Sequence, residues 1–291
     1  MRRRHIGLVV LVAAMLGLGA YGWDQLRFPA SSVAIPGTPV TLRVQGSVDD
    51  RSVSLVRDGV VLMHRYLGES VGGAPRRSVE ARIAATSPCA PFASLVGATS
   101  IGIAEPGWMC VDTANEGWPT RAAGDGRQVK LLAAHEYAHT WQAEQGCYLG
   151  EDKHTHQWLF EGVAEYLSWQ ALLRHGGLTR ADLGEYLRYT RAEHRDAATL
   201  RSHESEGNGD LYGRWHLAVR RLTARAPDAD RSLLRFCRSA GRGEDWRPAF
   251  TKAFGIRVDA FYASFDRTPQ RGGQGRASRR SRDASDAMLS F

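Results

Sequence analysis

The segment H-E-Y-A-H, from His135 to His139, is the feature that most restricts how this chain can fold. Residues four apart in a helix lie one turn above each other, so a helix here places both imidazoles on one face with Glu136 beside them. Two imidazoles and a neighbouring carboxylate suit a catalytic zinc ion, which takes nitrogen and oxygen ligands. Because so short a pattern also arises by chance, the surrounding sequence has to support this interpretation.

The residues around this segment have the pattern of a helix. Asp125 with Gln128 three residues later forms a capping box, and Gly146 is the type of residue that commonly follows a helix end. We therefore expect a helix over residues 127–145, with the two histidines near its middle. A second helix is expected over residues 156–175, where apolar residues recur at helical spacing.

A catalytic zinc site takes three protein ligands and leaves one position for water. Glu161 is the candidate third ligand, because the 21 residues after His139 suffice to end one helix and bring a second one alongside. Glu165 lies one turn further on, where it can accept a hydrogen bond from the far nitrogen of a ligating histidine. Gly162 and Ala164 are small, as close packing of two helices favours.

The string W-L-F-E-G-V-A-E-Y, from Trp158 to Tyr166, completes a resemblance to a known family. Together with H-E-x-x-H, it resembles the gluzincin zinc metallopeptidases, specifically bacterial domains similar to the aminopeptidase and thermolysin groups. The resemblance implies Glu161 as a zinc ligand and Glu165 as the residue behind it. It extends to Tyr212, which opens a Y-x-x-x-x-x-x-x-R-x-L string and by this match stabilises the oxyanion.

The chain departs from the family pattern in two respects. It has no G-x-M-x-N string, by which related aminopeptidases bind a free amine, so we expect an endopeptidase rather than an exopeptidase. His216, one turn after Tyr212, stands where the family has a small residue. It is either a second oxyanion donor or a polar neighbour of the cleft.

The function expected from these features is that of an exported zinc metallopeptidase acting on a peptide or protein. The resemblance implies that Glu136 takes a proton from a zinc-activated water and passes it to the leaving nitrogen. The alternative is a zinc-binding but non-catalytic cell-envelope protein on the same scaffold. The presence of Glu136 favours the enzyme, since a binding site has no need for a general base.

The N-terminus has the pattern of an export signal. An arginine cluster precedes an apolar run from Ile6 to Ala20. Ala20-Tyr21-Gly22 suits a signal peptidase, while residues 6–23 are nearly long enough to span a bilayer. We therefore expect residues 1–23 to be either a signal peptide or a membrane anchor, and the protein to be periplasmic or extracellular.

The net charge of +7 is carried by the two ends of the chain. Residues 2–4 supply three positive charges and residues 267–291 a net four, so residues 5–266 are neutral overall. A neutral body argues against nucleic acid as a partner.

Four cysteines lie beyond the export signal, at Cys89, Cys110, Cys147 and Cys237. An even number of cysteines suits two disulfides in an oxidising compartment. Of the three pairings we favour Cys89 with Cys110, because both lie in one strand-and-loop region, which leaves Cys147 with Cys237. Four buried thiols are the alternative.

The remaining pattern predicts an α+β, zincin-like fold in which a small mixed sheet precedes a mostly helical C-terminal part. The expected strands are Val40–Val44, Val79–Ile83, Val96–Ala104 and Trp108–Asp112. Helices are expected over 53–67 (capped by Asp49 or Asp50), 179–195, 211–225, 229–239 and 245–265. The edge strand near Val96–Ala104 would bind an extended peptide by main-chain pairing.

These elements give the expected domain boundaries. Residues 24–46, with three prolines, are expected to form a linker, residues 47–267 the metallopeptidase domain and residues 268–291 a disordered basic tail. Outside the motifs, four histidines are expected at the solvent-exposed surface: His154, His156, His194 and His203. Trp141, Trp158 and Trp169 are expected to pack the two motif helices together.

Overall fold

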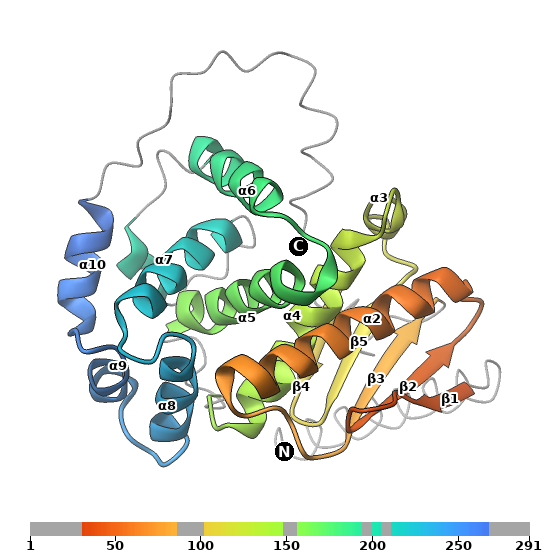
Figure 1. Cartoon of the computed structure of the whole chain (residues 1–291), viewed down its shortest axis with the longest axis horizontal. Coiled ribbons are helices and arrows are strands. Elements are labelled where there is room, and N and C mark those ends of the chain that lie inside the picture. Colours follow the sequence, from red (N-terminus) through yellow and green to blue (C-terminus); the bar gives the residue numbers. More distant parts are fainter. Residues whose placement is uncertain (1–30, 86–101, 148–155, 194–198, 205–210, 268–291) are drawn as a thin grey trace, which may run out of the picture.

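The computed structural model describes residues 31–85, 102–147, 156–193, 199–204 and 211–267. The expected α+β fold is confirmed, because a small mixed sheet precedes a mostly helical part (Figure 1). The predicted export signal and the predicted basic tail lie outside the described residues.

The sheet has five strands in the order β1-β2-β3-β5-β4. Its strands are β1 (Ser31–Ala34), β2 (Val40–Gln45), β3 (Val79–Ala84), β4 (Gly102–Glu105) and β5 (Trp108–Asp112). The two outer pairs are antiparallel, whereas β3 runs parallel to both β2 and β5. The sequence alternation in β3 is reflected in its burial: Val79, Ala81 and Ile83 face the core and Glu80 does not.

Two expectations for this region need correction or restriction. The linker expected over residues 24–46 is wrong for residues 31–34, because they form β1 and pair with β2, whereas β2 confirms the strand expected over Val40–Val44. Every residue of β1 is exposed, so its sequence has no apolar alternation to signal a strand. Of the strand expected over Val96–Ala104, residues 96–101 lie outside the described residues, while β4 forms the sheet edge.

Helix α2 (Asp50–Tyr66) lies across one face of the sheet (Figure 1). The Asp49 carboxylate caps it by accepting a hydrogen bond from the Ser52 N–H, as the sequence predicts. A π-helical turn, Leu67–Val71, extends the helix to Gly72, whose φ of 89° ends it. The buried side of α2 packs against the sheet core and the next long helix.

That long helix, α4 (Arg127–Glu144), carries the H-E-Y-A-H segment and packs against α2, β4 and β5. Its approach to α2 is very close, since a side chain at Gly59 would lie 2.5 Å from the Lys130 carbonyl oxygen. The capping box expected at Asp125 and Gln128 is wrong. Gly126, with φ of 72°, starts the helix without a side-chain cap.

The helical part follows the sequence pattern with one break. Its helices are α5 (Gln157–Ala171), α6 (Arg180–Glu193), α7 (Tyr212–Arg225), α8 (Arg231–Ala240), α9 (Trp246–Phe254) and α10 (Val258–Asp266), with a π-helical turn at Leu172–Gly176 and a 3₁₀ turn at Leu200–Glu204. The short α3 (Trp118–Ala122) precedes α4. The single helix expected over 245–265 is wrong, because Gly255 ends α9 with φ of 69°.

Two of the histidines expected at the surface are buried. His156 stacks on Trp246, and His203 accepts a hydrogen bond from the Trp215 indole, 3.3 Å between Nε1 and Nδ1. The prediction failed because aromatic side chains from other helices cover both imidazole rings. His154 and His194 lie outside the described residues. The three tryptophans expected to pack the motif helices together, Trp141, Trp158 and Trp169, are all buried. The rings of Trp158 and Trp169 stack on other helices, namely on Phe261 of α10 and on Tyr186 of α6.

A disulfide joins Cys147, just after α4, to Cys237 in α8. The sequence analysis predicted this pair, since pairing Cys89 with Cys110 leaves Cys147 for Cys237. A disulfide of this kind indicates an oxidising environment. Cys110 is also disulfide-bonded, while Cys89 lies outside the described residues.

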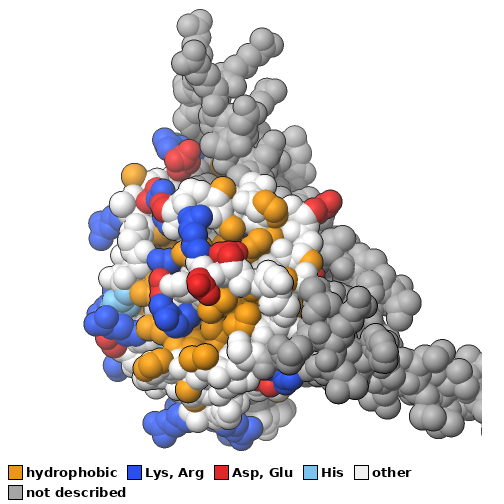
Figure 2. Space-filling view, turned by 90° about the vertical axis from the view of Figure 1, so that its right-hand side faces the viewer, with side chains coloured by type: hydrophobic (Ala, Val, Ile, Leu, Met, Phe, Trp, Pro, Cys, Tyr) orange, Lys and Arg blue, Asp and Glu red, His pale blue; other side chains and the backbone are white. Residues whose placement is uncertain are grey.

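The surface of the described part mixes both signs of charge. Figure 2 shows a face on which Lys and Arg side chains alternate with Asp and Glu side chains around hydrophobic groups. This mixture agrees with the neutral charge of residues 5–266. Within the described residues, none of the helices has the length and apolar character needed to cross a membrane.

Helices α5 and α7 meet at Gly162, and this contact leads to a stability prediction. A β-carbon there would lie 2.9 Å from the Trp215 carbonyl oxygen, whereas one at Gly184 in α6 would meet nothing within 4 Å. We expect Gly162→Ala to lower the free energy of unfolding by about 1–3 kcal/mol through overpacking. We expect the matched control Gly184→Ala to raise it by about 0.5–1 kcal/mol through helix propensity. Urea denaturation measures both, and an equal gain at the two positions would contradict the close contact.

Candidate functional site

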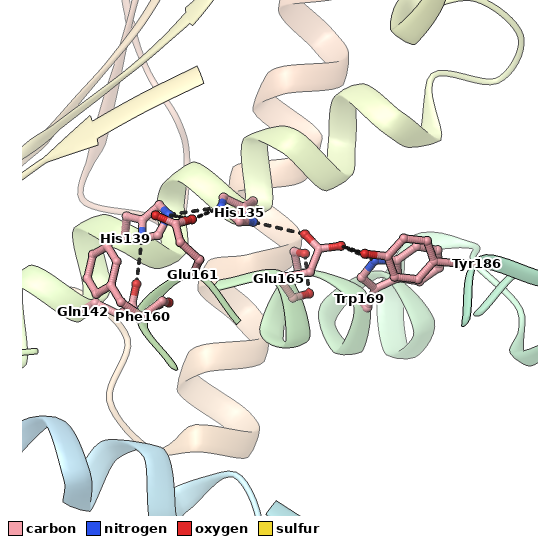
Figure 3. A network of polar contacts seen from close by, with 9 residues as sticks. His135, His139, Gln142, Phe160, Glu161, Glu165, Trp169 and Tyr186 are labelled. Carbon is pink, nitrogen blue, oxygen red and sulfur yellow. Dashed lines mark hydrogen bonds and ion pairs between the residues drawn. The ribbon is translucent and has the colours of Figure 1, made fainter. Parts of the chain in front are cut away.

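Helices α4 and α5 bring three side chains of the predicted zinc site together (Figure 3). The Nε2 atoms of His135 and His139 lie 3.1 Å apart, and Glu161 Oε2 lies 3.3 Å from each of them. Both imidazoles are buried and Glu161 is half-buried. Three ligand-type atoms therefore converge on one point between the two helices.

This triangle of atoms fits a tetrahedral zinc ion. Ligands at 2.0–2.1 Å from the metal in tetrahedral geometry lie about 3.3 Å from one another, which matches the observed separations. Two nitrogens and one carboxylate oxygen are also the ligand types of a catalytic zinc site that leaves one position for water. The residues present therefore fit the metal in both chemistry and spacing.

Glu165 lies behind His135 and is fully engaged by hydrogen bonds. Its Oε2 lies 3.2 Å from His135 Nδ1, while Oε1 accepts from the Trp169 indole at 2.8 Å and from the Tyr186 hydroxyl at 2.7 Å (Figure 3). Such a carboxylate fixes the tautomer and the orientation of a ligating imidazole. The structure thus places Glu165 where the sequence predicts it, and adds Trp169 and Tyr186 as residues that hold it.

A second hydrogen-bonded support, which the sequence analysis missed, lies behind His139. Gln142 Oε1 lies 2.7 Å from His139 Nδ1, and the Gln142 amide donates to the Phe160 carbonyl oxygen at 2.8 Å. The Phe160 ring also stacks on the His139 ring at 4.6 Å. Only its position in the sequence could have pointed to Gln142: it follows His139 by three residues, and residues three apart in a helix are neighbours.

Glu136 lies beside the cluster and directly under the edge strand β4. It is buried, and a side chain on Gly102 would collide with its carboxylate. Burial raises the pKa of Glu136, although the nearby His135 and His139 act in the opposite direction. A carboxylate whose proton affinity is raised in this way is suited to accept and return a proton.

Tyr212, at the start of α7, completes this side of the site. Its ring centroid lies 5.5 Å from that of His135, and its hydroxyl hydrogen-bonds the Glu161 carboxylate. Burial and the surrounding carboxylates raise the pKa of Tyr212 well above its ordinary value. The hydroxyl therefore stays protonated and can donate a hydrogen bond to an oxyanion.

His216 lies elsewhere. It is fully buried among the rings of Tyr166, Trp169 and Tyr186. Its ring thus lies among these aromatic side chains and near Glu165, and it is not part of the His135, His139 and Glu161 cluster. The role of His216 as an oxyanion donor stays a prediction that this placement does not favour.

The burial of His216 leads to a prediction about pH. Burial lowers its pKa to about 4, so between pH 4 and 6.5 the unfolded chain binds a proton that the folded chain excludes. Stability from this group is complete above pH 6.5 and is lost as pH falls toward 4, by about 3 kcal/mol. We expect His216→Leu to lose correspondingly less stability between pH 7 and pH 4 in urea unfolding. Parallel pH profiles for the two proteins would contradict this assignment.

The electrostatics of the cluster also favour a cation. Burial lowers the pKa of His135, but hydrogen bonds to Glu161 and Glu165 outweigh it and raise the pKa to about 10. Burial likewise raises the pKa of Glu161, and the two histidines outweigh it, so the net pKa is lowered. The carboxylates around the imidazoles thus create a strongly negative field, and positive charge is stabilised there.

No protein-family model and no curated protein sequence matches this chain. Among solved structures it is similar to an aminopeptidase N family protein from Idiomarina loihiensis, at 13% sequence identity and a TM-score of 0.48. The match covers 90% of this chain and 46% of that chain, so this chain spans less than half of that protein's length.

Proposed function

We propose that this protein is an exported zinc metallopeptidase of the gluzincin type that cleaves internal peptide bonds. The observation that carries the proposal is the triangle formed by His135 Nε2, His139 Nε2 and Glu161 Oε2, with a buried carboxylate beside it. Its spacing suits tetrahedral zinc, and the pairing of each histidine with a fixed acceptor suits a permanent metal site.

The catalytic roles follow from the position of each side chain. A zinc ion held by His135, His139 and Glu161 would supply the Lewis acidity that makes water nucleophilic at neutral pH. Glu136 accepts the proton of the attacking water, and its raised pKa lets it return that proton to the leaving nitrogen. Tyr212 donates a hydrogen bond to the developing oxyanion, which its high pKa allows it to do without ionising.

The edge strand β4 supports an extended peptide as the substrate. It forms the outer edge of the sheet next to α4, and Gly102 brings its backbone against the Glu136 carboxylate. A peptide pairing with this edge by main-chain hydrogen bonds would pass the general base. This mode of binding uses the middle of a chain rather than a free amine, which is why we propose an endopeptidase.

Export is part of the proposal. The Cys147–Cys237 disulfide supports an oxidising compartment, and the arginine cluster followed by the apolar run Ile6–Ala20 supports passage across a membrane. We propose a periplasmic or extracellular location, with residues 6–23 serving as the anchor if they are not removed.

Metal analysis combined with a peptide-library digest tests the proposed function. The purified full chain should contain about one zinc ion, should cleave peptides, should lose cleavage in a chelator and should regain it when zinc is added. His139→Gln should lose zinc, whereas the matched control His175→Gln should keep it, because His175 is half-buried beside Glu69 and does not belong to the cluster. Zinc with no cleavage would favour the non-catalytic envelope protein, and no zinc would refute both functions.

A further inference from the structure

Gln142 is buried between the two helices of the metal site and contacts both of them. The residue is only 1% exposed. Within α4 its Oε1 lies 2.7 Å from His139 Nδ1, and across to α5 its amide nitrogen donates to the Phe160 carbonyl oxygen at 2.8 Å (Figure 3). Both polar atoms of this side chain therefore have a partner, and one partner is the imidazole nitrogen of His139 that takes no part in the cluster.

The Phe160 carbonyl fixes which way the Gln142 amide points. A carbonyl oxygen only accepts hydrogen bonds, so the amide nitrogen of Gln142 has to face Phe160 and Oε1 has to face His139. The reversed amide would bring two acceptor oxygens together at hydrogen-bond distance. Since the Gln142 oxygen in turn only accepts, His139 Nδ1 carries a proton and donates a hydrogen bond to it.

This arrangement selects one tautomer of His139. A neutral imidazole has a single N–H, so a proton on Nδ1 leaves the lone pair on Nε2. His139 Nε2 is the atom that lies 3.1 Å from His135 Nε2 and 3.3 Å from Glu161 Oε2. A nitrogen needs a free lone pair to bind a metal. Gln142 thus favours the form of His139 that is ready to bind zinc.

The second hydrogen bond of Gln142 reaches the residue before Glu161. The Phe160 ring also stacks on the His139 ring, with centroids 4.6 Å apart and planes 19° from parallel. Gln142 could therefore affect the metal in two ways, either through its hydrogen bond to His139 or through the packing of α4 on α5. The two ways predict different results for variants that break only one of the two bonds.

Gln142 is also neutral, unlike the acceptor behind the other histidine. Three carboxylates, those of Glu136, Glu161 and Glu165, already act on His135. A neutral amide accepts the same type of hydrogen bond as Glu165 but adds no negative charge to this group. The two imidazoles therefore have unequal supports, a carboxylate behind His135 and an amide behind His139.

We propose that Gln142 is a positioning residue of the metal site, which holds the proton of His139 on Nδ1 and turns Nε2 toward the metal. It acts through this hydrogen bond rather than through the packing of α5. This inference rests on the zinc site of the proposed function but not on peptide cleavage.

Zinc affinity of the full chain, measured by competition with a chromophoric chelator, tests the proposal. Gln142→Met has a similar length but lacks both hydrogen-bonding groups, and it should weaken zinc binding by about 10- to 100-fold. Gln142→Glu keeps an acceptor for His139 and opposes only the bond to Phe160. It should bind zinc at least as tightly as wild type, although its metal-free form should unfold at a lower urea concentration. The matched control Gln145→Met should keep wild-type affinity, because Gln145 accepts a hydrogen bond from Arg238 instead.

Nitrogen NMR spectra of the metal-free chain with labelled histidines give a readout that needs neither zinc nor a variant that folds. At about pH 8.5 an ordinary imidazole is neutral, and the two tautomers have different ring-nitrogen shifts. The His139 signals are those that His139→Gln removes. We expect a protonated Nδ1 and a bare Nε2 in wild type and in Gln142→Glu, and a mixture of both tautomers in Gln142→Met.

Three results would overturn the proposal. Unchanged zinc affinity in Gln142→Met would show that the residue does not act on the metal. Equal weakening by Gln142→Met and Gln142→Glu would show that it acts through the packing of α5. A proton on His139 Nε2 in the wild-type chain would show that Gln142 does not select the tautomer. If the wild-type chain binds no zinc, the proposed function fails, and the nitrogen spectra still decide whether Gln142 holds the proton.

Discussion

Replacing Glu136 by glutamine should lower the turnover number for peptide cleavage by about 10³-fold while leaving one zinc ion bound per chain. Glutamine has nearly the same shape as glutamate, but its amide cannot accept a proton from the attacking water. Glu136 stands beside the His135, His139 and Glu161 triangle rather than in it, so the metal ligands are unchanged. Steady-state kinetics and metal analysis on the same preparation measure the two effects.

A matched control for this variant lies on the same helix. Glu144 is half-buried at the end of α4, where its carboxylate accepts hydrogen bonds from the backbone N–H groups of Arg76 and Arg77. Glu144→Gln makes the same chemical change outside the cluster and should leave turnover unchanged. If Glu136→Gln turned over as fast as wild type, Glu136 would not be the general base.

Removal of the Cys147–Cys237 disulfide should lower the free energy of unfolding by about 4 kcal/mol. The two cysteines are 90 residues apart in sequence, so the bond restricts a long loop of the unfolded chain. The double variant Cys147→Ala and Cys237→Ala, compared with wild type in urea under oxidising conditions, measures the effect. Alanine suits both positions because both side chains are buried.

A strong reductant supplies the control for this comparison. It opens the disulfides of the wild type, so the two proteins should then unfold at nearly the same urea concentration. The bond joins the end of α4 to α8. In the double variant, the free energy of zinc binding should fall less than the free energy of unfolding, because His135 and His139 keep their hydrogen bonds to Glu165 and Gln142. Equal stability of the two oxidised proteins would show that the bond contributes nothing measurable.

The parts of the fold that depend on neighbours in sequence could be predicted. The cap of α2 at Asp49, the limits of β5 and the position of the two histidines within α4 each follow from a short pattern, and the structure has them. Glu161 was expected beside both histidines because zinc needs a third ligand, the spacing from His139 allows a second helix and the family resemblance implies it. Helical periodicity adds only that Glu161 and Glu165 share a face of that helix.

The features that depend on distant partners could not be predicted. His156 and His203 are polar residues whose aromatic partners lie elsewhere in the chain: Trp246 and Phe236 for His156, and Trp215 for His203. Strand β1 has no apolar alternation, since it is exposed and held by pairing with β2. Gly126 starts α4 through its backbone conformation, whereas the side chains of Asp125 and Gln128 suggested a different cap.

The close contact at Gly162 determines which of two equivalent glutamates faces the metal site. Glu161 and Glu165 are one helical turn apart, so sliding α5 along its axis by one turn would put Glu165 in the place of Glu161 and keep a carboxylate beside the two histidines. The same slide would bring Tyr166 to the place of Gly162, against the backbone of Trp215, where even a single β-carbon would lie 2.9 Å from an oxygen. Gly162, which has no side chain, thus fixes the position of α5 along its axis. Because of it, Glu161 faces the two histidines and Glu165 lies behind His135.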